Sequence, residues 1–299
     1  MRFAAWRVVG RSKKLKFEFD KLKNVWQFTA GMSGVAVSGI ILLQLDKILL
    51  SKILNLDDFG RYSLAAVVAS GLYVFLTPLY NSIYPRMSAL VATGEAEELV
   101  FLYRMGAHFF LSIFFPIAIS IAVFSEELLY LWTGNQSLSV SSGKIVSLFV
   151  VGTALNGVMH FPYALQLAYG EARLPLAING ILIVVMIPTV YILAGSYGSV
   201  GGAAAWALTN TTYVLVGTWL THRFLLKGVG AKWLLVDVLP PLLMAIIVVG
   251  LGGVVIQEFG YPYYVNLVIA GVLVLLAFIF MLLFSSRLRS AARKIIQRY

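Results

Sequence analysis

Long apolar runs recur along this chain, and they set the strongest limit on what it can fold into. Eight segments come close to the length of about 20 residues that a helix needs to cross a bilayer. Turn-like stretches such as SYGSVGG (196–202) connect them, and 60% of all residues are hydrophobic. The sequence therefore predicts an all-α integral membrane protein with about eight transmembrane helices. The predicted spans are 26–53, 62–84, 106–124, 143–167, 174–194, 200–224, 236–256 and 263–284.

Basic residues flank these runs unevenly. All lysines and arginines except Lys47, Lys52, Arg61 and Lys144 fall on the side of the predicted helices that holds the N-terminus. Lys and Arg collect in cytoplasmic loops, so we expect a multi-pass protein of the cytoplasmic (inner) membrane with both termini in the cytoplasm. The net charge of +10 then reflects topology, and we expect no nucleic acid as a partner.

Two shorter segments between the runs are amphipathic. Residues 94–106 (GEAEELVFLYRMG) are predicted to lie along the cytoplasmic surface of the bilayer. Residues 125–135 (SEELLYLWTGN) are predicted to lie along the outer surface. Helices with one apolar and one charged face commonly rest in the membrane interface.

The first apolar run carries two adjacent charges, Asp46 and Lys47, near the predicted outer interface. Gln44 and Lys47 share one helical face, whereas Asp46 points about 100° away, so it does not simply neutralise its neighbour. We expect each charge to contact another helix. These contacts either hold the helix in place, or Gln44, Asp46 and Lys47 form a gate at the rim of a cavity.

A polar face crosses the fourth run. Thr153, Asn156, His160 and Tyr163 follow i, i+3, i+7, i+10 spacing on an otherwise apolar helix. Polar residues inside a membrane usually face the bundle interior or a water-filled cavity. This face either binds a polar substrate or relays a proton through His160, or else it makes hydrogen bonds between helices. Asn210, within TNTT (209–212), is a further polar residue that must face protein or water.

Arg86 follows the second run at its predicted cytoplasmic end. It either meets a phosphate group there or anchors the helix at the membrane surface. Enzymatic motifs are not found: the sequence has no Gly-x-Ser-x-Gly elbow, no His-Glu-x-x-His pair and no Walker loop. It contains no cysteine, and its three histidines lack metal-ligand spacing. We therefore expect no enzymatic activity, no cofactor and no metal site.

Five stretches together resemble a known family. In chain order they are DKILLSKILNLDDFGRYSLA (46–65), TPLYNSIYPRMSALVATGE (77–95), FSEELLYLWTG (124–134), PYALQLAYGEARLPLAING (162–180) and GSYGSVGGAAAWALTN (195–210). They look like the polysaccharide and O-antigen flippases of the multidrug/oligosaccharidyl-lipid/polysaccharide exporter superfamily. The resemblance covers about residues 20 to 225.

The resemblance implies a division of the chain. Family members have two lobes of six helices, and this chain resembles the C-terminal lobe. Residues 26–225 would form that lobe and residues 226–285 two additional transmembrane helices. Residues 1–25 would be a basic cytoplasmic segment, and residues 286–299 a basic cytoplasmic tail. The chain would then be a fragment, a half that pairs with a separate polypeptide, or one copy in a homodimer.

The resemblance also implies a function. The protein would translocate a lipid-linked oligosaccharide, a polyprenyl-diphosphate glycan, across the membrane by alternating access for surface polysaccharide biosynthesis. The residues that would bind this substrate are Arg86, Thr153, Asn156, His160, Tyr163 and Asn210.

Two other functions stay open at this point. A small-molecule or cation antiporter of the same superfamily would need a carboxylate within a span, whereas the acids after Asp46 fall near span ends or in loops. A scaffold subunit of glycan assembly would not transport at all.

Overall fold

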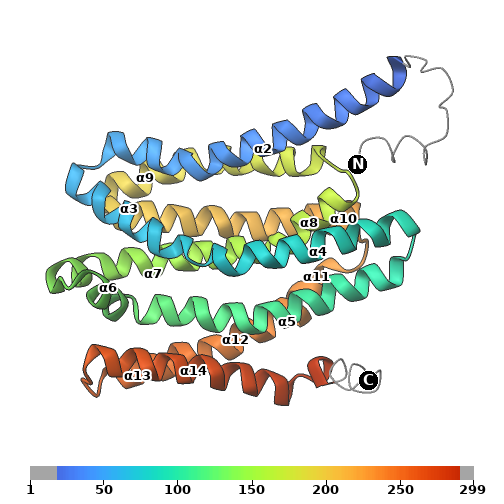
Figure 1. The fold of residues 1–299 in the computed structure, drawn as a ribbon. Helices are drawn as coiled ribbons and strands as arrows, with labels where there is room; N and C mark the ends of the chain where they lie inside the picture. The colour runs from blue at the N-terminus through green and yellow to red at the C-terminus, as the bar shows by residue number, and fades with distance from the viewer. Residues whose placement is uncertain (1–18, 290–299) are drawn as a thin grey trace, which may run out of the picture.

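The protein is a bundle of long helices that lie side by side (Figure 1). The computed structural model describes residues 19–289, and of residues 19–25, 27 and 28 it describes only the backbone. Within this range every regular element is a helix. Figure 1 shows α2 on one side of the bundle and α13 and α14 on the opposite side. The elements are α2 (Phe19–Ile53), α3 (Leu56–Ser70), α4 (Tyr73–Thr93), α5 (Ala96–Val123), α6 (Ser125–Thr133), α7 (Gln136–Val158), α8 (His160–Ala168), α9 (Arg173–Thr212), η1 (Tyr213–Gly217), α10 (Thr218–Phe224), α11 (Gly230–Lys232), η2 (Trp233–Val238), α12 (Leu239–Ala245), η3 (Ile246–Leu251), α13 (Gly252–Gln257) and α14 (Tyr263–Phe284).

The predicted spans all have counterparts among these helices. Six helical runs are long and apolar enough to cross a membrane, and the bent pair α3 and α4 makes a seventh. The longest run, Arg173–Phe224, has 52 residues and is interrupted by non-helical backbone at Gly198. Its two arms, 173–197 and 199–224, each exceed the length of about 20 residues that a span requires. The all-α membrane fold is confirmed for the described residues.

Two glycines allow α9 to turn back on itself. Gly198 has a φ of 60°, in the region that side chains other than glycine rarely adopt. A Cβ atom on Gly201 would lie 1.9 Å from the carbonyl oxygen of Leu193, so the backbones of the two arms touch there. Small residues permit this close approach of helices, and Figure 1 shows the chain reversing within α9.

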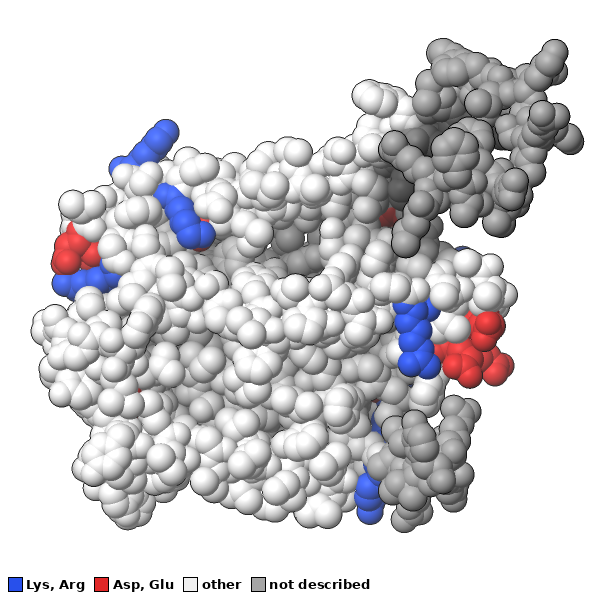
Figure 2. Space-filling view, in the orientation of Figure 1, with Lys and Arg blue, Asp and Glu red and all other residues white. Residues whose placement is uncertain are grey.

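Charged side chains collect at the two ends of the bundle. On the face shown in Figure 2, Lys, Arg, Asp and Glu lie at both ends, and the broad band between them carries none. Charges are costly at the centre of a bilayer, so this distribution suits a bundle that crosses one. Figure 1 shows that α2 begins and α14 ends at the same end. Of the predicted basic segments, residues 1–18 and 290–299 lie outside the described residues.

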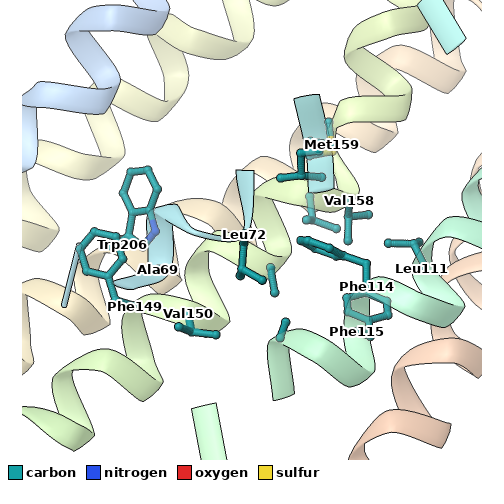
Figure 3. Close-up of a cluster of buried hydrophobic side chains, with 14 of the residues drawn as sticks. Ala69, Leu72, Leu111, Phe114, Phe115, Phe149, Val150, Val158, Met159 and Trp206 are labelled. Carbon is teal, nitrogen blue, oxygen red and sulfur yellow. The ribbon is translucent and has the colours of Figure 1, made fainter. Parts of the chain in front are cut away.

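A cluster of buried hydrophobic side chains lies where α3, α4, α5, α7 and α9 meet. Figure 3 shows Leu72, Phe114 and Phe149 from different elements pointing toward a shared interior. These side chains are buried, and the ring of Phe149 stacks on Trp206 with 5.4 Å between the ring centroids. In a bilayer the lipid tails are as apolar as leucine, so close van der Waals packing holds such helices together.

The prediction that residues 94–106 form a separate helix along the membrane surface is wrong. In the structure α5 is one continuous helix that begins at Ala96. Its first turns are packed against the bundle, because Tyr103 is buried between His222 and Trp233 and its hydroxyl lies 3.0 Å from Nε2 of His222. The amphipathic pattern therefore marks the packed end of a spanning helix. Residues 125–135, by contrast, contain the separate short helix α6.

A buried carboxylate ties the C-terminal helices to α5. Asp237 on η2 is fully buried and forms ion pairs with Arg104, at 2.6 Å from its Nε, and with Arg287, which follows α14. Nδ1 of His108 donates to the backbone carbonyl of Asp237 at 3.1 Å. The Ser285 hydroxyl then donates to Nε2 of His108 at 2.9 Å. These contacts join α5, η2 and the end of α14.

Candidate functional site

A cavity of about 230 Å³ lies between α2, α4, α8 and α9. Its α2 wall is apolar, and the remaining walls carry most of its polar groups. Figure 2 shows a hollow between α2 and the helices below it. Four of the six residues predicted to bind substrate line this cavity, namely Asn156, His160, Tyr163 and Asn210. The other lining residues are Val35, Gly39, Leu42, Leu43, Tyr73, Met159, Asn179, Trp206 and Tyr213.

A break between α7 and α8 shapes the polar wall. The Met159 N–H donates to the carbonyl of Asn156 at 3.0 Å, three residues back, so the helix tightens at this point. Pro162 has no N–H to donate to Val158, four residues back. The regular helix is therefore interrupted at Met159 and resumes as α8 at His160. The last turn of α7 and the first turns of α8 both contribute residues to the cavity.

An amide pair joins two helices at the cavity. Nδ2 of Asn156 donates to Oδ1 of Asn210 at 2.9 Å, and Oδ1 of Asn156 accepts from the Tyr73 hydroxyl at 3.3 Å. Nδ2 of Asn210 donates to the carbonyl of Trp206 at 2.9 Å. Nε1 of Trp206 donates to the hydroxyl of buried Thr153 at 3.2 Å. The polar face thus lines a cavity and also bonds helices together, and Thr153 does only the second.

His160 presents a hydrogen-bond acceptor. Its Nδ1 lies 3.3 Å from the backbone carbonyl of Asn156. A carbonyl oxygen only accepts, so the neutral ring carries its proton on Nδ1 and keeps a lone pair on Nε2. The ring also lies 6.3 Å from the ring of Tyr73, measured between centroids. A ligand hydroxyl that reached Nε2 could therefore donate to it.

A row of tyrosines leads from the cavity along α4. Tyr163 stacks on Tyr80 with 6.0 Å between the ring centroids, and Tyr80 stacks on Tyr84 with 5.5 Å. We call Tyr163, Tyr80 and Tyr84 the tyrosine ladder. Arg86 lies two residues beyond Tyr84, is exposed, and does not line the cavity. The structure therefore separates Arg86 from the other predicted binding residues.

The lining residues that were not predicted as site residues include Tyr73, Asn179 and Tyr213, which carry polar groups. Tyr73 lies in apolar surroundings in the sequence, where a tyrosine is no sign of a cavity, whereas Tyr213 directly follows the polar stretch TNTT (209–212). Asn179 is an isolated polar residue in the fifth predicted span, and that polarity was the one available signal. In the structure its Nδ2 donates to the hydroxyl of Ser38 on α2 at 2.8 Å, which ties α9 to α2 beside the cavity.

The adjacent charges of α2 lie about one turn beyond the cavity wall. Asp46 is only 1% exposed and accepts a hydrogen bond of 2.5 Å from the Tyr62 hydroxyl on α3, so it contacts another helix as expected. The polar contacts of Lys47 are on its own helix instead. Its Nζ lies 3.8 Å from Asp46 and donates to the carbonyl of Leu43 at 3.0 Å, because a long flexible side chain can reach around the helix. Gln44 is exposed.

Removing the Tyr62 hydroxyl is expected to destabilise the protein by about 1–3 kcal/mol, because Tyr62→Phe leaves a buried carboxylate without its hydrogen bond. Thermal unfolding of the purified protein in detergent measures this. The matched control is Tyr197→Phe, at a tyrosine that is 69% exposed, and it should unfold like the wild type. Equal unfolding temperatures for the Tyr62→Phe variant and the wild type would contradict the prediction.

Comparison with known protein families gives a match over part of the chain. Residues 2–142, just under half of the 299 residues, match a family described as polysaccharide biosynthesis protein. The matched region contains Asp46, Tyr73 and Arg86 and ends before Asn156. A comparison with curated proteins finds no match. The family match supports a polysaccharide-synthesis or flippase-like family for this membrane protein, whose N-terminal part is similar to polysaccharide biosynthesis proteins.

Proposed function

We propose that this protein moves a lipid-linked oligosaccharide across the cytoplasmic membrane by alternating access, for surface polysaccharide biosynthesis. The observation that carries the proposal is the amide pair of Asn156 and Asn210 at a cavity inside the helix bundle. Sugar hydroxyls both donate and accept hydrogen bonds, and so do amides. The similarity of residues 2–142 to polysaccharide biosynthesis proteins supports the same class of substrate.

The chemistry of the cavity favours a glycan over a coupling ion. Its lining side chains are amides, one imidazole, aromatic rings and apolar groups, and no Asp or Glu is among these described residues. A few polar groups in an apolar wall are typical of sites that bind an organic ligand. We therefore favour glycan transport over cation-coupled export of small molecules, and transport over an enzymatic reaction.

The size of the cavity supports a second lobe. Ligand pockets usually measure about 300–1,000 Å³, and the cavity here, at about 230 Å³, is smaller than that. We propose that residues 26–225 act as one lobe and supply one wall of a larger passage. A second lobe would supply the other wall. Residues 226–285 would hold the polyprenyl tail.

The proposed orientation places both termini in the cytoplasm of an inner-membrane protein. Arg86 would then lie at the cytoplasmic end of the tyrosine ladder. A guanidinium group binds phosphate oxygens through several N–H donors, so Arg86 is our candidate for first contact with the diphosphate. The sugars would pass from there along the ladder to Asn156 and Asn210.

The experiment that tests this function is deletion of the coding sequence in its host, followed by measurement of lipid-linked oligosaccharide in each leaflet. Precursor that accumulates in the inner leaflet while surface glycan is lost would support the proposal. Unchanged glycan in both leaflets would reject it. Loss of the precursor itself would indicate a scaffold role in assembly.

Asn210→Ala is expected to slow glycan export about fivefold, because the variant loses a hydrogen-bonding group that contributes about 1 kcal/mol. Export is measured as surface glycan per molecule of protein in the membrane. The matched control is Thr211→Ala, because Thr211 is exposed and its hydroxyl donates within its own helix, to the carbonyl of Ala207. Equal export by the two variants would contradict a role for Asn210 in binding.

A further inference from the structure

We infer a second site in this protein, a binding site for a hard monovalent cation such as Na⁺ at the buried carboxylate of Glu127. Glu127 lies in the first turn of α6 and is 3% exposed. It lines an open cavity of about 650 Å³ between α6, the first half of α7 and the start of α14. This site is separate from the cavity between α2 and α9 and does not depend on the proposed function.

One oxygen of the Glu127 carboxylate has no partner. Oε1 accepts from Nε2 of Gln257 at 2.9 Å and from Nδ2 of Asn266 at 3.1 Å. Oε2 is buried and has no hydrogen bond, and the ion pairs of the described residues do not include Glu127. A buried carboxylate is strongly unfavourable unless its charge is paired. A cation at Oε2 would supply the missing charge.

A second unpartnered oxygen belongs to Asn266, the residue that donates to Glu127. Asn266 on α14 is also 3% exposed and lines the same cavity. Because its Nδ2 must donate to Glu127, its Oδ1 points the other way. That Oδ1 is buried without a hydrogen bond as well. Two buried oxygens on two helices thus lack a hydrogen bond, and both belong to residues that line one cavity.

Two hydroxyl groups complete a set of oxygen ligands. Ser125 and Ser147 line the cavity, and their Oγ atoms lie 3.0 Å apart. Ser125 donates to the carbonyl of Gly143 and Ser147 to the carbonyl of Ala122, so both hydroxyl oxygens keep lone pairs for a cation. Carboxylate, amide and hydroxyl oxygens together favour a hard cation.

The charge of the site favours a monovalent ion. One buried carboxylate balances one positive charge, whereas Ca²⁺ takes about 6–8 oxygen ligands, commonly with several carboxylates. Within the described residues no group of three His, Cys, Asp or Glu side chains could hold a transition metal. No metal site was expected from the sequence because it has no cysteine and its three histidines lack metal-ligand spacing.

The other charges near Glu127 do not replace the cation. The start of α6 offers about half an elementary charge but no hydrogen bond to Oε2. Lys144 lines the cavity but is exposed and forms none of the ion pairs of the described residues. Glu126 also lines the cavity, but it is exposed and acidic, so it does not neutralise Glu127 either.

Equilibrium binding of ²²Na⁺ to the purified full chain in detergent tests the site. Ionic strength is held constant with choline chloride, and unlabelled Na⁺ competes. The wild type should show saturable binding, and its unfolding temperature should rise with Na⁺ but not with choline. Glu127→Gln should weaken Na⁺ binding about tenfold or more, because the affinity of a cation site changes by orders of magnitude with the charge of its ligands. The matched control Glu126→Gln removes an exposed neighbouring carboxylate and should keep saturable binding.

Three outcomes would overturn the inference. They are wild-type protein without saturable ²²Na⁺ binding, a Glu127→Gln variant that binds like the wild type, and displacement of ²²Na⁺ by Ca²⁺ at far lower concentrations than by Na⁺. If Glu127→Gln does not fold, Asn266→Ala serves in its place, because it removes the amide oxygen and keeps the carboxylate. Wild-type affinity in a folded Asn266→Ala variant would also count against the site.

Discussion

Replacing Gly201 with alanine is expected to leave little folded protein in the membrane. The added Cβ would lie 1.9 Å from the carbonyl oxygen of Leu193 and 2.4 Å from its carbonyl carbon. These are backbone atoms, which cannot rotate away as a flexible side chain can. The two arms of α9 would have to separate, and the second arm would carry Trp206 and Asn210 out of the cavity wall. The measurement is the yield of monodisperse protein extracted from membranes.

Gly195→Ala is the matched control for this substitution. Gly195 lies on the first arm of the same helix, and a Cβ there would meet nothing within 4 Å. Alanine is the better helix former by about 1 kcal/mol, so this variant should fold at least as well as the wild type. A Gly201→Ala variant that extracts and unfolds like Gly195→Ala would show that the arms do not touch at Gly201.

Replacing Asp237 with alanine is expected to lower the stability of the protein by about 3–5 kcal/mol, because removal of one member of a buried ion pair leaves its partners uncompensated. Asp237 is the only acidic group in its ion pairs with Arg104 and Arg287, and it is fully buried. Its loss should loosen the C-terminal helices from α5. Thermal or denaturant unfolding in detergent measures the change, and limited proteolysis reports whether α14 is released.

The matched control for Asp237 is Asp57→Ala. Asp57 also pairs with an arginine, Arg61, at 2.6 Å, but it is 76% exposed and lies on the protein surface. Exposed ion pairs contribute about 0.2–1 kcal/mol, so this variant should stay close to the wild type. If the two variants lose stability equally, the ion pairs of Asp237 do not hold the C-terminal helices.

The spans of this protein could be predicted because hydropathy is a local property. The last predicted span, 263–284, begins and ends at the same residues as α14. The prediction for residues 94–106 failed because hydropathy is local and does not show which partner an apolar face contacts. An apolar helix face has the same sequence pattern when it contacts lipid and when it packs against protein. Here it packs against His222 and Trp233, from distant parts of the chain.

The candidate site was predictable only where its residues share one helix segment. The helical spacing of polar residues in the sequence identified Asn156, His160 and Tyr163. Asn210 was named for its polarity, but its bond to Asn156 depends on α9 turning back over a separation of 54 residues. Glu127 was missed as a site because its burial depends on Gln257 and Asn266, which lie 130 and 139 residues away.

The ion pairs of Asp237 impose an order on the biosynthesis of this protein. Arg104 and Asp237 are 133 residues apart, and Arg287 follows 50 residues later. At a synthesis rate of about 5–20 residues per second, Asp237 leaves the ribosome roughly 7–27 s after Arg104. Helix α5 is therefore made before Asp237, and Arg104 can form this ion pair only after η2 has been synthesised. A ribosome that stalled before Asp237 would leave a nascent chain with this interface open.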